Sequence, residues 1–285
     1  MANETTPSEL GQGLVRENWG PRYISALYEG HSVAKYISNI TGDFNRGDLA
    51  NVPVEPVLTV NDTASDGSLT VQSVTFTNVQ VAIDKKKDVT AELTGIARKQ
   101  AEKKFEETFP ISAGKAMRQQ IESDILALYS DVTTTASGDG TGNLGEDEFL
   151  AAIQRMVTAK LPIIDEPGSF CFALADNQFA PVKKLNLLDY DRTGEAGKGG
   201  AASMGVPMLW NVPVVFSTQV ATASSIRQSM LFSKDAFAWA AQRNVEPRFA
   251  DRLAAAKDSY LMTVLGLYGV KTVTAGRANV LKSKA

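Results

Sequence analysis

The stretch from Asn51 to Ile83 constrains the fold more than any other part of the chain. It holds two β-type runs, separated by a polar turn region from Asn61 to Ser68. The first run, Val52 to Val60, contains two prolines, and proline has no N–H group to donate to a central ladder. We therefore expect the first run to be an exposed strand.

The second run, Leu69 to Ile83, is rich in Val and Thr, and its apolar residues change face along the way. Side chains in a strand alternate with period two, so each change requires a bulge or a change in which face is covered. This pattern predicts a long hairpin that crosses from one environment to another. The successive faces carry Leu69 and Val71, then Val74 and Phe76, then Val79, Val81 and Ile83.

Residues 88 to 135 are predicted to be helical. The pattern from Val89 to Glu107 is amphipathic, and we expect Pro110 to reset the chain. After it, Ser112 is the expected N-cap of a helix about 30 Å long, at 1.5 Å per residue. Such a helix would serve as a structural spine. Its apolar stripe has spacings of three and four: Ala113, Met117, Ile121, Ile125, Leu128 and Val132.

The remainder mixes helices and strands. Residues 136 to 235 predict a separate α/β region with a helix from Glu146 to Lys160, a buried strand from Phe170 to Leu174, a short helix through Phe179, Val182 and Leu185, and a strand from Leu209 to Phe216. At Phe237 to Ala241 the chain would begin to return from this α/β region to the part that contains the long helix. The tail predicts a short helix near Asp251 to Lys257 and strands at Tyr260 to Thr274 and Asn279 to Leu281, with Gly266 and Gly269 as irregularities.

Composition excludes several classes of protein. The formal net charge is -3, and the longest basic run, Lys85 to Lys87, is flanked by Asp84 and Asp88, so direct condensation of nucleic acid is not expected. The N-terminus lacks the regions of a signal peptide. The longest apolar candidate, Tyr260 to Val270, is too short for a membrane span of about 20 residues. We expect synthesis in a reducing cytoplasm and no membrane partner.

The single cysteine and single histidine limit the available chemistry. Cys171 lies in an apolar run, so we interpret it as a small buried hydrophobic residue, and it leaves no partner for an intrachain disulfide. His31 is the only histidine, which excludes sites with several histidines and leaves a Ser-His-Asp triad only if that one residue serves.

One motif resembles a cofactor site. Gly140 to Gly145 fits G-x-G-x-x-G, but a long helix and a Thr/Ser loop precede it where a dinucleotide fingerprint needs a strand. The same stretch lacks the glycine and glutamate of a calcium loop, and Gly194 to Gly200 lacks the Walker spacing. Glu146 to Glu148 is explained by the dipole at a helix start. We therefore expect no catalytic, cofactor or metal site, and no enzyme.

The order of these elements resembles the tailed-bacteriophage major capsid protein family, whose fold is shared with encapsulins and the herpesvirus capsid floor. Four segments carry the resemblance, each of them degenerate: the hairpin from Gly47 to Ile83, the helix from Pro110 to Tyr129 with Ile121-Glu122-Ser123-Asp124-Ile125-Leu126, the segment from Met204 to Val215, and Leu267-Tyr268-Gly269-Val270-Lys271. Asn211 stands where many relatives have glycine.

The resemblance implies an α+β chain in five parts. These are an N-terminal arm (residues 1–45), an extended β-hairpin loop (46–84), the first part of a peripheral domain with the spine helix (85–135), an axial α/β domain (136–235) and the return of the peripheral domain (236–285). It further implies subunit-interface residues on the extended loop: Val54, Val57, Leu58, Val60, Val71, Val74 and Phe76.

The implied function is a coat protein that assembles into hexamers and pentamers of an icosahedral shell, in the host bacterial cytoplasm. The shell would become the virion capsid and enclose double-stranded DNA without sequence-specific binding. A separate scaffolding protein, a portal and, in some shells, a decoration protein are the implied partners. Two alternatives stay open: an encapsulin-like nanocompartment shell, and a soluble α/β nucleotide-binding enzyme that uses the loop from Gly140 to Gly145.

Overall fold

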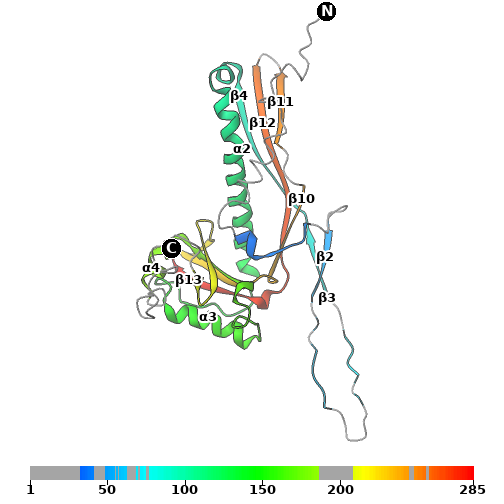
Figure 1. The fold of residues 1–285 in the computed structure, drawn as a ribbon, viewed down its shortest axis with the longest axis vertical. Coiled ribbons are helices and arrows are strands. Elements are labelled where there is room, and N and C mark those ends of the chain that lie inside the picture. The colour runs from blue at the N-terminus through cyan, green and yellow to red at the C-terminus, as the bar shows by residue number, and fades with distance from the viewer. Residues whose placement is uncertain are drawn as a thin grey trace, which may run out of the picture.

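The computed structural model describes residues 33–41, 49–54, 56, 58–62, 69, 71–74, 77–185, 208–243, 247–254 and 257–285; at 93–107, and at the described positions from 242 to 260, it describes the backbone alone. A long helix lies beside a sheet of long strands, with a compact α/β part at one end (Figure 1). Strands β2 (Leu49–Val54) and β3 (Thr77–Ala82) form the base of a projection that leads away from the long sheet and from the α/β part. This projection corresponds to the extended loop predicted at residues 46–84, and it is called the arm below; it is distinct from the predicted N-terminal arm.

The first sheet is organised around one strand, β12 (Lys257–Thr272). Strand β4 (Lys85–Thr94) pairs with it from Ser259 to Tyr268. Strands β11 (Pro247–Ala254) and β10 (Phe237–Arg243) pair one after the other with β12. Both pair with residues of β12 that β4 also pairs with, so they lie along the edge of β12 opposite β4. The short strand β1 (Ser38–Asn39), which follows the 3-10 turn η2 (Val33–Tyr36), adds to β10 in parallel.

Helix α2 (Gly95–Leu126) is the predicted spine, and it continues as the 3-10 turn η4 (Ala127–Asp131). Its 32 residues span about 48 Å at 1.5 Å per residue, longer than the sequence predicted. The first four residues of the predicted stripe are buried, and Leu128 and Val132 are half-buried against the same core. The apolar face of the spine is therefore confirmed, although the α-helix ends before Leu128.

Two predictions around this helix were wrong. Residues 89–94, predicted as helix, belong to β4, because pairing with β12 overrides a local amphipathic pattern. Pro110 does not end one helix and begin another; it lies inside the continuous helix α2. Proline in a helix interior removes a hydrogen bond at a cost of about 3 kcal/mol, and here the Pro110 and Phe109 side chains are buried, which offsets part of that cost.

The second sheet has the order β13-β9-β5-β7-β6, and β8 pairs with β9. Helix α3 (Glu146–Thr158), the 3-10 turns η5 (Pro167–Ser169) and η6 (Asp176–Gln178), and helix α4 (Phe179–Lys184) connect to it. The predictions of α3, of α4 and of the buried strand β5 are confirmed. The strands are β5 (Phe170–Ala175), β6 (Met208–Leu209), β7 (Val212–Ser217), β8 (Thr222–Ala223), β9 (Ile226–Ser233) and β13 (Ala278–Lys284).

Strand β5 joins the two cores because it is buried on both faces. Its large residues, Phe170, Phe172 and Leu174, pack with α3. Its small residues alternate with them and pack in the core that contains the α2 stripe: Cys171, Ala173 and Ala175. One face of the second sheet is thus the floor of the core beneath the spine helix.

Three further predictions differ from the structure. The run from Leu209 to Phe216 is two strands, because Trp210 and Asn211 form a tight turn with φ of 50° and 64°. Asn tolerates that left-handed conformation, which explains why a residue other than glycine can stand at position 211. Residues 251–254 belong to β11, not to a helix, since every residue of β11 pairs with β12. The last strand, β13, which follows the 3-10 turn η9 (Ala275–Arg277), pairs with β9 rather than joining the first sheet.

Gly266 and Gly269 mark close approaches, not irregularities, within the unbroken strand β12. A Cβ at Gly269 would lie 1.9 Å from the carbonyl oxygen of Ala82, and one at Gly266 would lie 3.1 Å from the Met117 side chain. Gly269 lets β3 approach β12, and Gly266 lets the spine helix pack on the sheet.

Replacing Gly269 with alanine should therefore destabilise the subunit. Since the obstacle is backbone, the strand must shift, and we expect a loss of about 2–3 kcal/mol in the free energy of unfolding. Urea denaturation of the unassembled subunit measures it. Gly276→Ala is the matched control, because a Cβ there meets nothing within 4 Å. Equal stabilities of the two variants would contradict the close-approach explanation.

Candidate assembly surfaces

The arm is an antiparallel ladder of six residue pairs, from Leu49 opposite Ala82 to Val54 opposite Thr77. This two-stranded sheet pairs with no other sheet among the described residues. Pro53 lies in it, as predicted for an exposed edge strand, because neither strand has a second described neighbour. The hairpin predicted from the sequence is confirmed at its base.

Beyond Val54 and Thr77 the predicted strands do not continue through the described residues 56, 58–62, 69 and 71–74. Pro56 cannot donate to a ladder, which stops the pairing there. The Gln72 side chain connects the two strands of the arm instead: the Thr59 N–H donates to Gln72 Oε1 at 3.1 Å, and Gln72 Nε2 donates to the Thr59 carbonyl. In this stretch the two strands are connected by this side chain, and the described residues form no ladder.

The arm exposes large aliphatic side chains. Val60 is 99% exposed, Val71 91%, Leu69 77% and Leu58 64%. Val74 is exposed to a smaller degree, and Val54 is half-buried. Val57 and Phe76, the other two predicted interface residues, lie outside the described residues. A concentration of exposed aliphatic residues of this kind is typical of a surface that another protein covers.

The base of the arm, in contrast, is fixed in the body. Val81 is fully buried, and Ile83 packs with Ala240 and Leu267 of the first sheet. The phase change predicted along the second run corresponds to this passage from solvent to core. The arm is therefore a rigidly based projection with an apolar outer part.

A polar joint connects the spine helix to β12 and β4. The Tyr268 hydroxyl donates to Asp124 Oδ2 at 2.6 Å, and Lys85 Nζ lies 3.5 Å from the same oxygen. Burial and the neighbouring Asp124 carboxylate raise the pKa of Tyr268 above its usual 10.0. Sequence reasoning missed this joint, because its three residues are far apart in the chain.

A second polar network, also missed, fixes the last strand. The fully buried Asn279 amide donates to the Thr135 carbonyl at 2.8 Å, and its Oδ1 accepts from Ser137 Oγ at 2.9 Å. Arg155 of α3 donates to the same Ser137 hydroxyl. These bonds hold β13 against the segment after the spine helix, which is the physical reason that it joins the second sheet.

The loop from Gly140 to Gly145 is not arranged as a cofactor site. The Leu144 N–H donates to the buried Gln178 side chain at 2.9 Å, and the Gly145 N–H donates to Glu148 of α3 at 2.8 Å. The Thr141 N–H donates to Asp139, and the bonds from Thr141 lower the pKa of that carboxyl. Because side chains occupy these N–H groups, they cannot cradle a phosphate as a dinucleotide loop does.

The other chemical candidates have no site geometry. Cys171 is fully buried, and desolvation raises its pKa, which confirms it as a core residue. Within the described part of the chain no cluster of three metal-binding side chains occurs. None of the described helices has the length and apolarity required to cross a bilayer. His31 and Gly194 to Gly200 lie outside the described residues.

Comparison with solved structures settles the fold. A structure from Mycobacterium phage Che8 superposes with a TM-score of 0.69 at 18% identity, over 88% of this chain and 91% of that one. The capsid structure of the cyanophage P-SCSP1u gives 0.66 at 12% identity, over 89% and 88%. The chain has the phage major capsid fold. A virus-like particle from Pyrococcus furiosus shares it at a TM-score of 0.55 and 12% identity, over 93% and 98%.

No family model matches the chain, and no curated protein matches its sequence. The α+β class and the capsid fold expected from the order of elements are confirmed by the structure and its neighbours. At identities of 12–18% the likeness is one of architecture. The function therefore has to be argued from the exposed surfaces of this chain.

The joint at Tyr268 yields a stability prediction. Tyr268→Phe removes one hydrogen bond to a carboxylate, so we expect a loss of about 1–2 kcal/mol in the free energy of unfolding at neutral pH. Because the folded-state pKa is raised, the stabilisation is fully present below pH 10.0 and is lost as pH rises further. Unfolding titrations at several alkaline pH values measure both effects.

Tyr129→Phe is the control for the loss of a phenol, since Tyr129 is only partly buried against the same core. It should retain the unfolding free energy of the natural chain at neutral pH. If both variants showed the same alkaline loss as the natural chain, Tyr268 would not be its source.

Proposed function

We propose that this protein is the major capsid protein of a tailed phage. Copies of the chain associate into hexamers and pentamers, and these close into an icosahedral shell around double-stranded DNA. The role is structural, with no catalytic step. The domain boundaries proposed with it are 1–45, 46–84, 85–135, 136–235 and 236–285, with β13 returning to the axial part.

The observation that carries the proposal is the arm. An isolated subunit would leave Leu58, Val60, Leu69 and Val71 in water, on backbone whose polar groups no ladder satisfies. Burying one such side chain contributes about 1.5–3 kcal/mol, so covering several is a large driving force for association. Together with the capsid fold, this supports Val54, Val57, Leu58, Val60, Val71, Val74 and Phe76 as residues that contact a neighbouring subunit.

The proposed setting follows from the same role. The shell assembles in the host bacterial cytoplasm and becomes the virion capsid. A separate scaffolding protein, a portal and, in some shells, a decoration protein are its partners. The net charge of -3 supports a shell that encloses DNA without condensing it directly.

An encapsulin-like nanocompartment shell is the second candidate, since the fold is shared with a virus-like particle from Pyrococcus furiosus. The higher TM-scores of the phage structures favour the phage shell. The contents of purified particles separate the two candidates, because enclosed protein cargo supports the nanocompartment and packaged DNA supports the phage.

Assembly of the chain co-expressed with its scaffolding protein tests the proposal. We expect closed shells by negative-stain electron microscopy and a matching size by light scattering. The double variant Val60→Asp/Val71→Asp should fold but lose shells, because a contact that buries a carboxylate without a partner is unfavourable by several kcal/mol.

Val157→Asp is the matched control, since this valine is exposed on α3 and not on the arm. It should assemble as the natural chain does. A natural chain that remains a small oligomer even with its scaffolding protein would overturn the proposed function. Shells formed equally well by the arm variant would remove the arm from the interface.

A further inference from the structure

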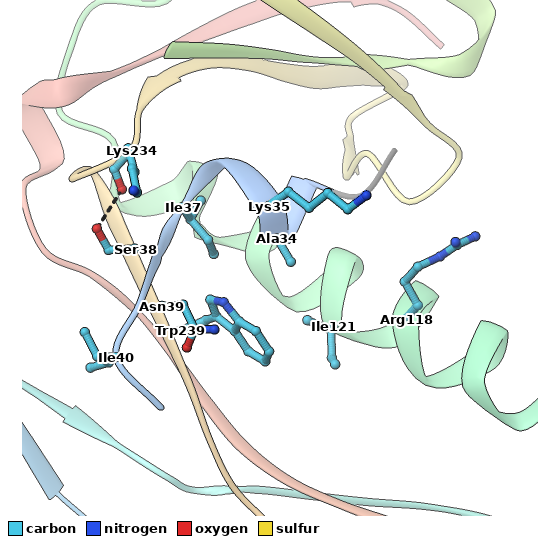
Figure 2. A pocket seen from close by; sticks show the side chains of 10 residues that line it. All are labelled: Ala34, Lys35, Ile37, Ser38, Asn39, Ile40, Arg118, Ile121, Lys234 and Trp239. Carbon is cyan, nitrogen blue, oxygen red and sulfur yellow. Dashed lines mark hydrogen bonds between the residues drawn. The ribbon is translucent and has the colours of Figure 1, made fainter. Parts of the chain in front are cut away.

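A pocket of about 500 Å³ lies within one subunit, where η2 and β1 cross the spine helix and β10. The buried side chains of Ile37, Ile121 and Trp239 line it, and the Trp239 ring stands among the lining residues (Figure 2). Small-molecule pockets in proteins measure about 300–1,000 Å³ and are lined mainly by apolar and aromatic side chains. The size and lining of this pocket therefore suit a small molecule with an apolar body.

The charged groups of the pocket are all basic. The exposed Lys35 and Lys234 line it on opposite sides, and Arg118 adds a third positive charge (Figure 2). No acidic residue lines the pocket in the described part of the chain, and the ion pairs there leave both lysines unused. Asp235, next to Lys234 in the chain, is paired with Arg277 at 3.1 Å. The two ammonium groups are therefore available to an anion.

Trp239 adds a donor that has no acceptor. Its side chain is 4% exposed, and its indole N–H has no hydrogen-bond partner among the described residues. Buried indole N–H groups normally have one, because an unsatisfied buried donor is unfavourable. An oxygen atom of a ligand in the pocket would satisfy it. Apolar walls, two free cations and an unmet donor together are the complement of a carboxylate on an apolar body.

The backbone around the pocket offers little to a peptide. The Ser38 N–H donates to the Lys234 carbonyl and the Ile40 N–H to the Trp239 carbonyl, both at 3.0 Å. Strand β1 has only two residues, whereas a peptide that adds to a sheet edge depends on a row of main-chain hydrogen bonds. The groups left for recognition are side chains, which favours a small ligand over an added strand.

We propose that this pocket binds a free aliphatic carboxylic acid. The carboxylate lies near the indole N–H and the two lysines, and the chain packs on Ile37, Ile121 and the indole ring. The proposal goes beyond the shell-forming role, because the site lies within a single subunit and requires neither the arm nor a neighbouring copy.

A bound acid would also stabilise the subunit. Residues of η2 and β1 form one wall of the pocket, and residues of the spine helix and β10 form another. A ligand between them contacts elements that are far apart in the chain and is lost when the chain unfolds. A ligand that binds only the folded state raises the unfolding temperature as its concentration rises.

Fluorescence quenching of Trp239 tests the proposal. The chain has three tryptophans, so Trp19→Phe/Trp210→Phe leaves Trp239 as the only one. Bromine quenches an excited indole at close range, and ω-bromoundecanoate, used below its micelle concentration, should quench this variant saturably. The neutral probe ω-bromoundecanol has the same chain and should bind about fivefold more weakly or less, because it lacks the charge that the lysines recognise.

Removing the positive charges locates the carboxylate. In the same background, Lys35→Gln/Lys234→Gln changes two exposed residues and should weaken binding of ω-bromoundecanoate about fivefold or more, with binding of ω-bromoundecanol unchanged. Lys183→Gln/Lys184→Gln is the matched control, since it removes two exposed charges on α4 and should leave the binding of both probes as it was. Undecanoate should also raise the unfolding temperature of the natural chain more than that of the pocket variant.

Three outcomes would overturn the proposal. The first is no saturable quenching in a subunit whose circular dichroism matches that of the natural chain, which is also the result expected if a protein segment fills the pocket. The second is equal binding of the acid and the alcohol. The third is an equal loss of binding in the pocket variant and the α4 control. All three are measured on unassembled subunits, so they leave the proposed function intact, and a failure to form shells leaves the ligand site intact.

Discussion

The close approach of backbone at β12 is the constraint on which the rest of the fold depends. Three long neighbours, β4, β10 and β11, take their register from this strand, and the spine helix packs across it. That arrangement requires Gly269, where the carbonyl of Ala82 occupies the space of a side chain, and Gly266, which faces Met117. The base of the arm is set by the same contact, because Ala82 ends β3. The direction in which the arm leaves the body is thus determined in the core.

The two sheets are not independent bodies joined by a linker. Small residues of β5 and the apolar stripe of α2 share one core, and Asn279 ties the last strand to the segment that follows the helix. Because the two sheets share this core and these hydrogen bonds, a displacement of one of them is transmitted to the other. The outer part of the arm is the opposite case. Its described residues form no ladder and expose aliphatic side chains, so its stability depends on what covers it.

The sequence predicts those elements whose signal is local. The stripe from Ala113 to Ile125, helix α3 and the apolar run of β5 each carry their pattern within one element, and each was placed correctly. Residues 89–94 and 251–254 were predicted as helix because their local composition allows one, whereas their conformation is decided by β12, which for β4 lies more than 160 residues away. Tyr268 and Asp124 are separated by 144 residues, so no local pattern reports their bond. The predicted interface residues of the arm came from a resemblance in the order of elements, and those that the structure describes as exposed are Leu58, Val60, Val71 and Val74.

Helix α2 is long enough to act as a lever arm. Asp124, bound to Tyr268, lies near one end, and Gly95 is at the other. A rotation of roughly 5° about Asp124 displaces the distant end by about 4 Å, given a rise of 1.5 Å per residue. That displacement is close to the spacing of about 4.8 Å between neighbouring strands. A small change of angle at the polar joint would therefore become, at the far end of the helix, a displacement comparable to the separation of two strands.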